Sequence, residues 1–332
     1  MLEKTIYPWQ VTQWGQVWQS RKMDRLAHAL LLVGINGLGK KHFALTLAGS
    51  VLCKNPNAAG YACGSCHACH LLAGNSHPDL VLIEPEESAK NISVDQIREL
   101  VRVVNETTMQ GGFRVVVINP ATAMNVNAAN ALLKTLEEPT PNTLIILISD
   151  HGMRLPATIM SRCQKIIFSK PSETEAIHWL QTAMPDKSFD FSLLLKLADG
   201  APLKALALMD KDLFVLRQDL YQGLHLLGEN QLDPLTLSAK WQDKEQLQII
   251  DLLLSWLTDV LRFQLTQDQA ILINQDYTVQ IAKMSTVLLK KNLLALMDYL
   301  QQTRAMVLAA INLNKQLLLE DIFIRWATYV SR

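Results

Sequence analysis

A glycine-rich segment at residues 34–41 contains most of a phosphate-binding loop. It reads Gly34-Ile35-Asn36-Gly37-Leu38-Gly39-Lys40-Lys41. In such a loop, backbone N–H groups at a helix start bind phosphate oxygens, and the lysine reaches the outer phosphates. The next residue is normally Ser or Thr, whose hydroxyl binds Mg²⁺. Lys41 occupies that position and has no oxygen to offer, so the usual metal ligand is missing.

The acids that complete an NTPase site are also missing where they are expected. A hydrophobic strand should end in an aspartate for the metal, with an acid or amide beyond it to position water. The suitable strand, Arg114–Ile118, continues into Asn119-Pro120-Ala121, and no carboxylate follows before Glu137. The sequence therefore predicts an NTPase core that has lost its chemistry. Phosphate binding by the loop amides and Lys40 remains open, because neither needs Mg²⁺.

An active ATPase is the main alternative, with Glu137 or Asp150 in place of the missing acids. Glu137 lies far beyond the strand along the chain, whereas metal and water must lie within a few ångströms of the γ-phosphate. We therefore expect that this chain does not hydrolyse ATP by itself.

Four cysteines within seventeen residues could hold a metal ion. They are Cys53, Cys63, Cys66 and Cys69. Four thiolates can close a tetrahedron around a structural Zn²⁺, whereas a catalytic zinc keeps one position open for water. The alternatives are free thiols, disulfides, or replacement of one cysteine by a nearby histidine (His67, His70 or His77). The spacing favours a closed zinc site in an exposed insertion at residues 53–76, suited to an interface.

An arginine in the segment Ser161-Arg162-Cys163 precedes the last expected strand. In ring-forming NTPases, an arginine at this place stabilises phosphate charge in the neighbouring subunit's site, because guanidinium binds phosphate oxygens in a bidentate manner. Arg162 is the candidate for such a residue, called an arginine finger. The alternative is an ordinary solvated surface arginine.

Composition limits the function further. Of 332 residues, 49% are hydrophobic and 19% charged, and 31 Lys and Arg balance 31 Asp and Glu. With this balance of charges, no net positive charge attracts the protein to nucleic acid or anionic lipid. The N-terminal residues lack the apolar run of a signal peptide, so we expect a cytoplasmic protein with reduced thiols.

Alternating β-rich and helical patterns from residue 28 to 150 predict a parallel sheet with helices on both faces. We expect strands at 29–33, 80–83, 115–118, 144–148 and 166–168. Later segments are helical, at 173–183, 191–198 and 202–209, then 213–227, 244–266, 278–288, 290–311 and 313–330. The last group could be an oligomerisation domain or an ordinary monomeric bundle.

The segment Asn127-Ala128-Ala129-Asn130-Ala131-Leu132-Leu133-Lys134-Thr135-Leu136-Glu137-Glu138-Pro139, with Ser161-Arg162-Cys163 and the four cysteines, resembles the bacterial clamp-loader AAA+ ATPases. The resemblance implies an α/β AAA+ (P-loop NTPase-like) domain at residues 1–169 with the zinc module at 53–76. A small helical lid at 170–210 and an all-α collar at 211–332 would follow. In that family, the collar holds a pentameric ring together.

Tyr7-Pro8-Trp9 and the missing acids are similar to a non-catalytic stator of that family. Such a subunit lies beside a gamma or tau subunit, in a ring that also contains a delta subunit. It presents the arginine of its Ser-Arg-Cys motif, here Ser161 and Arg162, to the neighbour's ATP. The ring opens the beta sliding clamp and places it on primed DNA, and four matching cysteines hold Zn²⁺.

Two features of the sequence bear on whether the chain binds and hydrolyses nucleotide. Active relatives carry a Gly-Ser-x-Arg motif in the lid, where this chain has Gly200-Ala201-Pro202-Leu203, with Lys204 one place late. The absence of this arginine agrees with a loss of ATP hydrolysis. Conversely, Gly39-Lys40 is better preserved than an inert subunit requires, so ATP binding stays open. A free-standing zinc adaptor is a third possible class.

Overall fold

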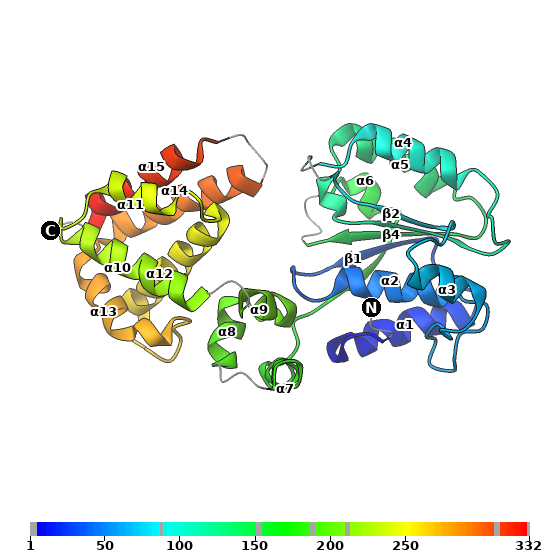
Figure 1. Ribbon diagram of the computed structural model, residues 1–332, viewed down its shortest axis with the longest axis horizontal. Helices are drawn as coiled ribbons and strands as arrows, with labels where there is room; N and C mark the ends of the chain where they lie inside the picture. Colours follow the sequence, from blue (N-terminus) through cyan, green and yellow to red (C-terminus); the bar gives the residue numbers. More distant parts are fainter. Residues whose placement is uncertain are drawn as a thin grey trace. The chain divides into compact units, whose positions relative to one another are not determined.

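The computed structural model describes residues 5–86, 89, 91–150, 155–185, 190–209, 213–308 and 313–330 (Figure 1). The chain forms two compact units, each described by itself below. The first contains Met1–His178 with Ala201–Lys204, and the second contains Trp179–Gly200 with Ala205–Arg332. The division into three parts expected from the sequence, with a boundary near residue 210, stays a prediction.

A five-stranded parallel sheet forms the centre of the first unit. Its strands are β1 (Ala29–Val33), β2 (Leu80–Ile83), β3 (Arg114–Ile118), β4 (Thr143–Ser149) and β5 (Gln164–Ile167). They lie in the order β2-β3-β4-β1-β5, and every pairing is parallel. The expected α/β AAA+-like class is confirmed, and each strand lies within two residues of its predicted bounds.

Helices cover both faces of this sheet because successive strand residues point to opposite sides. Leu30 and Leu32 of β1 pack in one core with α2 (Lys40–Leu52). Ala29 and Leu31 pack in the other with α4 (Val94–Val104) and α5 (Val126–Glu137). Figure 1 shows α1 and α2 on one face and α4 and α5 on the other. The remaining helical elements of this unit are η1 (Pro8–Gln10), α1 (Val11–Lys22), α3 (His67–Ala73), η2 (Ala121–Ala123) and α6 (Ala157–Met160).

Helix α1 was not expected from the sequence, yet it fastens the N-terminal segment to the core. Its Trp14 and Val17 are buried. Arg21 donates to the backbone oxygen of Ser50 at 2.6 Å and to its Oγ at 2.7 Å. These contacts tie α1 to α2, the helix that begins at the phosphate loop.

All regular elements among the described residues of the second unit are helices. Its elements are α8 (Phe191–Leu197), α10 (Leu213–Gly228), α11 (Pro234–Trp241), α12 (Gln246–Thr266), η4 (Gln275–Tyr277), α13 (Thr278–Val287), α14 (Lys290–Leu308) and α15 (Lys315–Val330). Two further helices, α7 (Glu173–Ala183) and α9 (Pro202–Met209), belong partly to each unit. Helix α11 was not expected, and residues 309–311 of the helix expected at 290–311 lie outside the described part. No described helix has the length and apolar character needed to span a bilayer.

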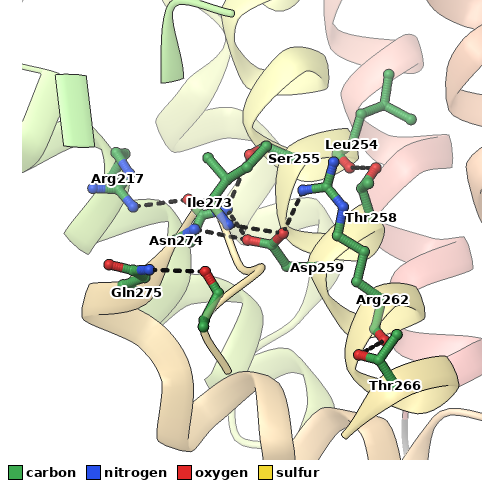
Figure 2. Close-up of polar contacts among 11 residues, drawn as sticks. Arg217, Leu254, Ser255, Thr258, Asp259, Arg262, Thr266, Ile273, Asn274 and Gln275 are labelled. Carbon is green, nitrogen blue, oxygen red and sulfur yellow. Dashed lines mark hydrogen bonds and ion pairs between the residues drawn. The ribbon is translucent and has the colours of Figure 1, made fainter. Parts of the chain in front are cut away.

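A buried aspartate organises the loop between α12 and α13 (Figure 2). Asp259 is fully buried and accepts hydrogen bonds from Ile273 N (3.1 Å) and Asn274 N (2.7 Å). Its carboxylate also accepts from Asn274 Nδ2 at 2.8 Å and Arg262 Nη1 at 3.0 Å. Arg217 of α10 donates to Asn274 Oδ1 at 2.9 Å. One carboxylate thus connects the loop to α12, and Asn274 extends the network to α10.

We predict that Asp259→Ala destabilises the helical unit by about 3 kcal/mol, because it leaves several buried N–H donors without an acceptor. Native-state hydrogen exchange in α12 gives the free energy of opening. The control is Asp298→Ala, an exposed aspartate of α14, which should change stability by less than about 0.5 kcal/mol. Equal effects of the two substitutions would contradict the role given to Asp259.

Candidate functional site

The phosphate loop connects the carboxyl end of β1 to the start of α2. Gly34 N donates to Ser149 O at 3.3 Å, which fixes the loop's first residue to the end of β4. Gly37 and Gly39 adopt φ values of +87° and +81°, where side chains with a Cβ are strained. Gly39 is also the N-cap of α2. The glycines therefore let the chain turn sharply into a helix whose N-terminal N–H groups face the loop.

Lys40 does not extend into open space. Its side chain is buried, and Nζ donates to Gly34 O at 2.7 Å and to Ile35 O at 2.8 Å. The third partner is Asp150, whose Oδ1 lies 2.8 Å from Nζ. An ammonium has three N–H donors. All three of Lys40 have acceptors in this chain, so binding phosphate would require it to leave at least one of them.

Two other segments lie directly against the loop glycines. A Cβ built at Gly39 would be 2.5 Å from Tyr7 Cδ2, and Gln10 Nε2 donates to Leu38 O at 2.8 Å. A Cβ built at Gly37 would be 2.7 Å from the Cβ of Lys204, and Leu203 N donates to Gly37 O at 3.1 Å. The N-terminal segment and the first turn of α9 therefore pack on the loop from within the same unit.

Lys41 contacts an acid that the sequence analysis did not single out. Its Nζ lies 2.7 Å from Glu84 Oε2, and Asn119 Nδ2 donates to Glu84 Oε1 at 2.7 Å. Burial alone would raise the pKa of Glu84, but Lys41 and Asn119 hold it below its ordinary value. Glu84 follows β2, which is adjacent to β3, so the strand order brings it to Asn119. The sequence signal that could have identified Glu84 as a site residue was its position directly after a predicted strand.

These residues do not fit a catalytic Mg²⁺. Mg²⁺ requires oxygen ligands in near-octahedral geometry. Where the loop should supply a hydroxyl, it supplies the ammonium of Lys41, and that ammonium is paired with the nearby carboxylate of Glu84. We therefore derive no hydrolytic step through a metal at this loop.

The two acids of the alternative ATPase hypothesis lie in different places. Asp150 is at the phosphate loop, paired with Lys40. Glu137 instead pairs with Arg162, with 2.6 Å between Oε1 and Nη2. This pairing counts against Glu137 as a replacement for the missing acid, because Arg162 precedes β5 and the loop follows β1, at the other ends of these neighbouring strands.

Arg162 lies between α6 and β5, and its side chain is about one-third exposed. Besides the ion pair with Glu137, its Nη1 donates to Thr158 O at 2.9 Å and Ser161 Oγ at 3.2 Å. Ser161 Oγ itself donates to Thr158 O at 3.1 Å. These contacts hold the guanidinium at the surface of its own domain.

Strand register separates this arginine from the phosphate loop of the same chain. Leu30 of β1 pairs with Gln164 of β5. Gly34 lies four residues further along β1, which corresponds to about 13 Å at roughly 3.3 Å per residue. Arg162 lies on the other side of Gln164, so the structure keeps the two groups apart.

The four cysteines form a compact cluster. Their sulfurs all lie within 4.8 Å of one another, and those of Cys66 and Cys69 are 3.5 Å apart. Four sulfurs about 2.3 Å from a central zinc would lie about 3.8 Å apart. The separations exceed a disulfide bond, and no histidine joins the cluster among the described residues. The cluster can therefore hold a metal such as Zn²⁺ with a closed set of ligands.

Backbone amides prepare these sulfurs for a cation. Cys63 N donates to Cys53 Sγ at 3.3 Å, and Gly64 N donates to Cys69 Sγ at 3.3 Å. Hydrogen bonds from Ser65 and Cys66 lower the pKa of Cys63 to about 5, whereas burial raises the pKa of Cys69 to about 12. Metal binding must therefore release a proton from Cys69 near neutral pH, which strengthens binding as pH rises.

The cluster is fastened to α1 by aromatic side chains. Trp14 Nε1 donates to Ala59 O at 2.9 Å, and Trp18 Nε1 donates to Ala58 O at 3.3 Å. The ring of Trp14 stacks on Tyr61, with 4.7 Å between centroids. Helix α1 thus supports the cysteine loop through Trp14 and Trp18.

Two sequence-family models match the chain. One, described as DNA polymerase III, delta subunit, matches residues 9–172. The other, described as DNA polymerase III, delta subunit, C terminal, matches residues 211–328.

Several proteins named DNA polymerase III subunit delta' are similar over nearly their whole length. The one from Pseudomonas aeruginosa is 40% identical, over 97% of this chain and 98% of its own. Those from Haemophilus influenzae and Escherichia coli are 31% and 30% identical, over 98% of this chain and 98% and 96% of their own. Among solved structures, a DNA polymerase III gamma subunit-related protein from Thermotoga maritima matches with a TM-score of 0.45 and 20% identity, over 95% of this chain and 99% of its own.

We predict that Cys66→Ser removes the metal and loosens residues 53–76 while the sheet core is retained, because one of four ligands is lost. Elemental analysis measures the metal, and limited proteolysis measures the loosening. Cys163→Ser is the matched control, since Cys163 lies outside the cluster and should leave one metal ion per chain. Wild-type protein without metal would contradict the assignment.

Proposed function

The chain belongs to the DNA polymerase III subunit delta' family, and from this premise we propose that it is the non-catalytic stator of the bacterial clamp loader. In this role it does not hydrolyse ATP. It supplies Arg162 to the ATP site of a neighbouring gamma or tau subunit. With these subunits and delta it forms a pentameric ring that loads the beta sliding clamp onto primed DNA.

The observation that carries this proposal is the separation of Arg162 from its own phosphate loop. The register of β1 with β5 puts the loop at the carboxyl ends of these neighbouring strands and the arginine at their amino ends. An arginine that cannot reach its own site can still reach a site on another subunit. Its bidentate hydrogen-bonding geometry and permanent charge suit phosphate oxygens.

Arg162 would change partners when the ring forms. In the isolated chain its guanidinium is paired with Glu137, which is itself exposed. Exposed ion pairs contribute only about 0–1 kcal/mol, so exchanging Glu137 for a neighbour's phosphate costs little. Ser161 and Thr158 would keep the loop in place during this exchange.

The chain's own phosphate loop also supports the stator role. Lys40 is occupied by Asp150 and two loop carbonyls, and Lys41 replaces the residue that should bind Mg²⁺. The backbone at Lys204 and Leu203 packs on Gly37, where the lid of an active relative would present an arginine. Together these features favour a loop that serves as a scaffold.

The remaining parts of the proposal concern assembly. The cysteine cluster would hold structural Zn²⁺ and form an interface, and the helical residues 211–332 would form the collar of the ring. A lid at residues 170–210 and a cytoplasmic location complete the proposal. These parts rest on family membership and on the helical content of the second unit.

We predict that Arg162→Ala leaves folding and ring assembly intact but lowers ATP hydrolysis at the adjacent site by at least tenfold, since a finger arginine contributes roughly 10³–10⁵ in related systems. The measurement is ATP turnover and clamp loading by a complex reconstituted with gamma or tau and delta subunits. Ring assembly is checked separately by size-exclusion chromatography.

Arg98→Ala is the control, because Arg98 is an exposed arginine of α4 paired with Asp95. It should leave turnover unchanged. Unaltered hydrolysis by an assembled ring containing Arg162→Ala would count against the finger role.

A further inference from the structure

Three side chains from separate elements meet where an NTPase would hold its metal ion. Lys41 is the second residue of α2, Glu84 follows β2, and Asn119 follows β3. Ile83 pairs with Ile118, so Glu84 and Asn119 leave the sheet at the same level. Each oxygen of the Glu84 carboxylate has a partner at 2.7 Å, Oε2 in Lys41 Nζ and Oε1 in Asn119 Nδ2.

A side chain of α4 holds the backbone of Glu84 in place. Gln96 Nε2 donates to Glu84 O at 2.9 Å. Gln96 also forms the capping box of α4 with Ser93, in which Ser93 N donates to Gln96 Oε1 at 2.9 Å. The carboxylate therefore extends from an anchored position rather than from a loose loop.

The ammonium of Lys41 supplies the positive charge that a divalent ion would otherwise supply. A metal ion at Glu84 would have to displace this ammonium and would be repelled by it at close range. The lysine is covalently attached, so it loses no translational freedom when it pairs, whereas a free ion does. The competition therefore favours the lysine over Mg²⁺ at ordinary concentrations.

We propose that Lys41 is a tethered cation that takes the place of the divalent metal ion of a phosphate-loop NTPase and keeps Glu84 from binding one. The inference deepens the proposed function, since it concerns the same loop. Its test measures metal binding rather than hydrolysis or ring assembly, so the two proposals can fail separately.

The test compares the affinity for Mn²⁺ of the zinc-loaded full chain with the affinities of its variants. The electron paramagnetic resonance signal of free Mn²⁺ measures how much Mn²⁺ is bound. Lys41→Thr removes the ammonium and restores a hydroxyl, and it should bind Mn²⁺ at least tenfold more tightly than the wild-type chain. Because Lys41 is nearly half exposed, the substitution should leave the fold intact, which circular dichroism and zinc content check. Lys41→Ser provides a second variant with the same expectation.

The double variant Lys41→Thr/Glu84→Gln is the matched control, and it should lose the gained site because the carboxylate is gone. Mg²⁺ should compete with Mn²⁺ at the gained site. Two results would overturn the proposal. They are no gain in Mn²⁺ binding over the wild type in either folded single variant, or an unchanged gain in the double variant.

Discussion

All strands of the sheet run in the same direction, and this constraint decides which side chains can meet. Residues that follow the strands gather at the carboxyl edge, as Gly34, Glu84 and Asn119 do. Arg162 precedes β5 and therefore lies toward the amino edge, where Glu137 pairs with it. The phosphate loop and the proposed finger arginine thus belong to one chain but cannot act together in it. This separation is the physical reason for proposing that the arginine acts on a neighbouring subunit.

At the carboxyl edge, each lysine of the loop has its own acid. Lys40 pairs with Asp150 and Lys41 pairs with Glu84. An active site would direct one ammonium toward phosphate and leave the acids for metal and water. Here the charges neutralise each other within the fold, and the glycines that should receive phosphates contact Tyr7 and Lys204 instead. The loop keeps its backbone shape because β1 and α2 still need a sharp connection.

Much of this arrangement could be predicted from sequence. Apolar runs located the five strands, and the runs are longest in β1, β3 and β4, because strands buried on both faces need apolar residues at nearly every position. Cysteine spacing located the four-cysteine cluster that could hold a metal ion. Glu84 was missed because its relation to Asn119 depends on strand order, which no local pattern specifies. Helix α11 was missed although Asp233 and Pro234 are typical N-cap and N1 residues. Helix α1 was missed because its apolar residues are few and its stability comes from packing against α2.

We propose that this chain keeps the phosphate-loop fold as a scaffold although the loop's own chemistry is lost. The most direct measurement is release of inorganic phosphate from ATP by the purified isolated chain, with and without Mg²⁺. We expect no turnover above the uncatalysed background, and no change when Mg²⁺ is chelated by EDTA. Magnesium-dependent turnover that co-purifies with the chain and disappears in Lys40→Ala would contradict it.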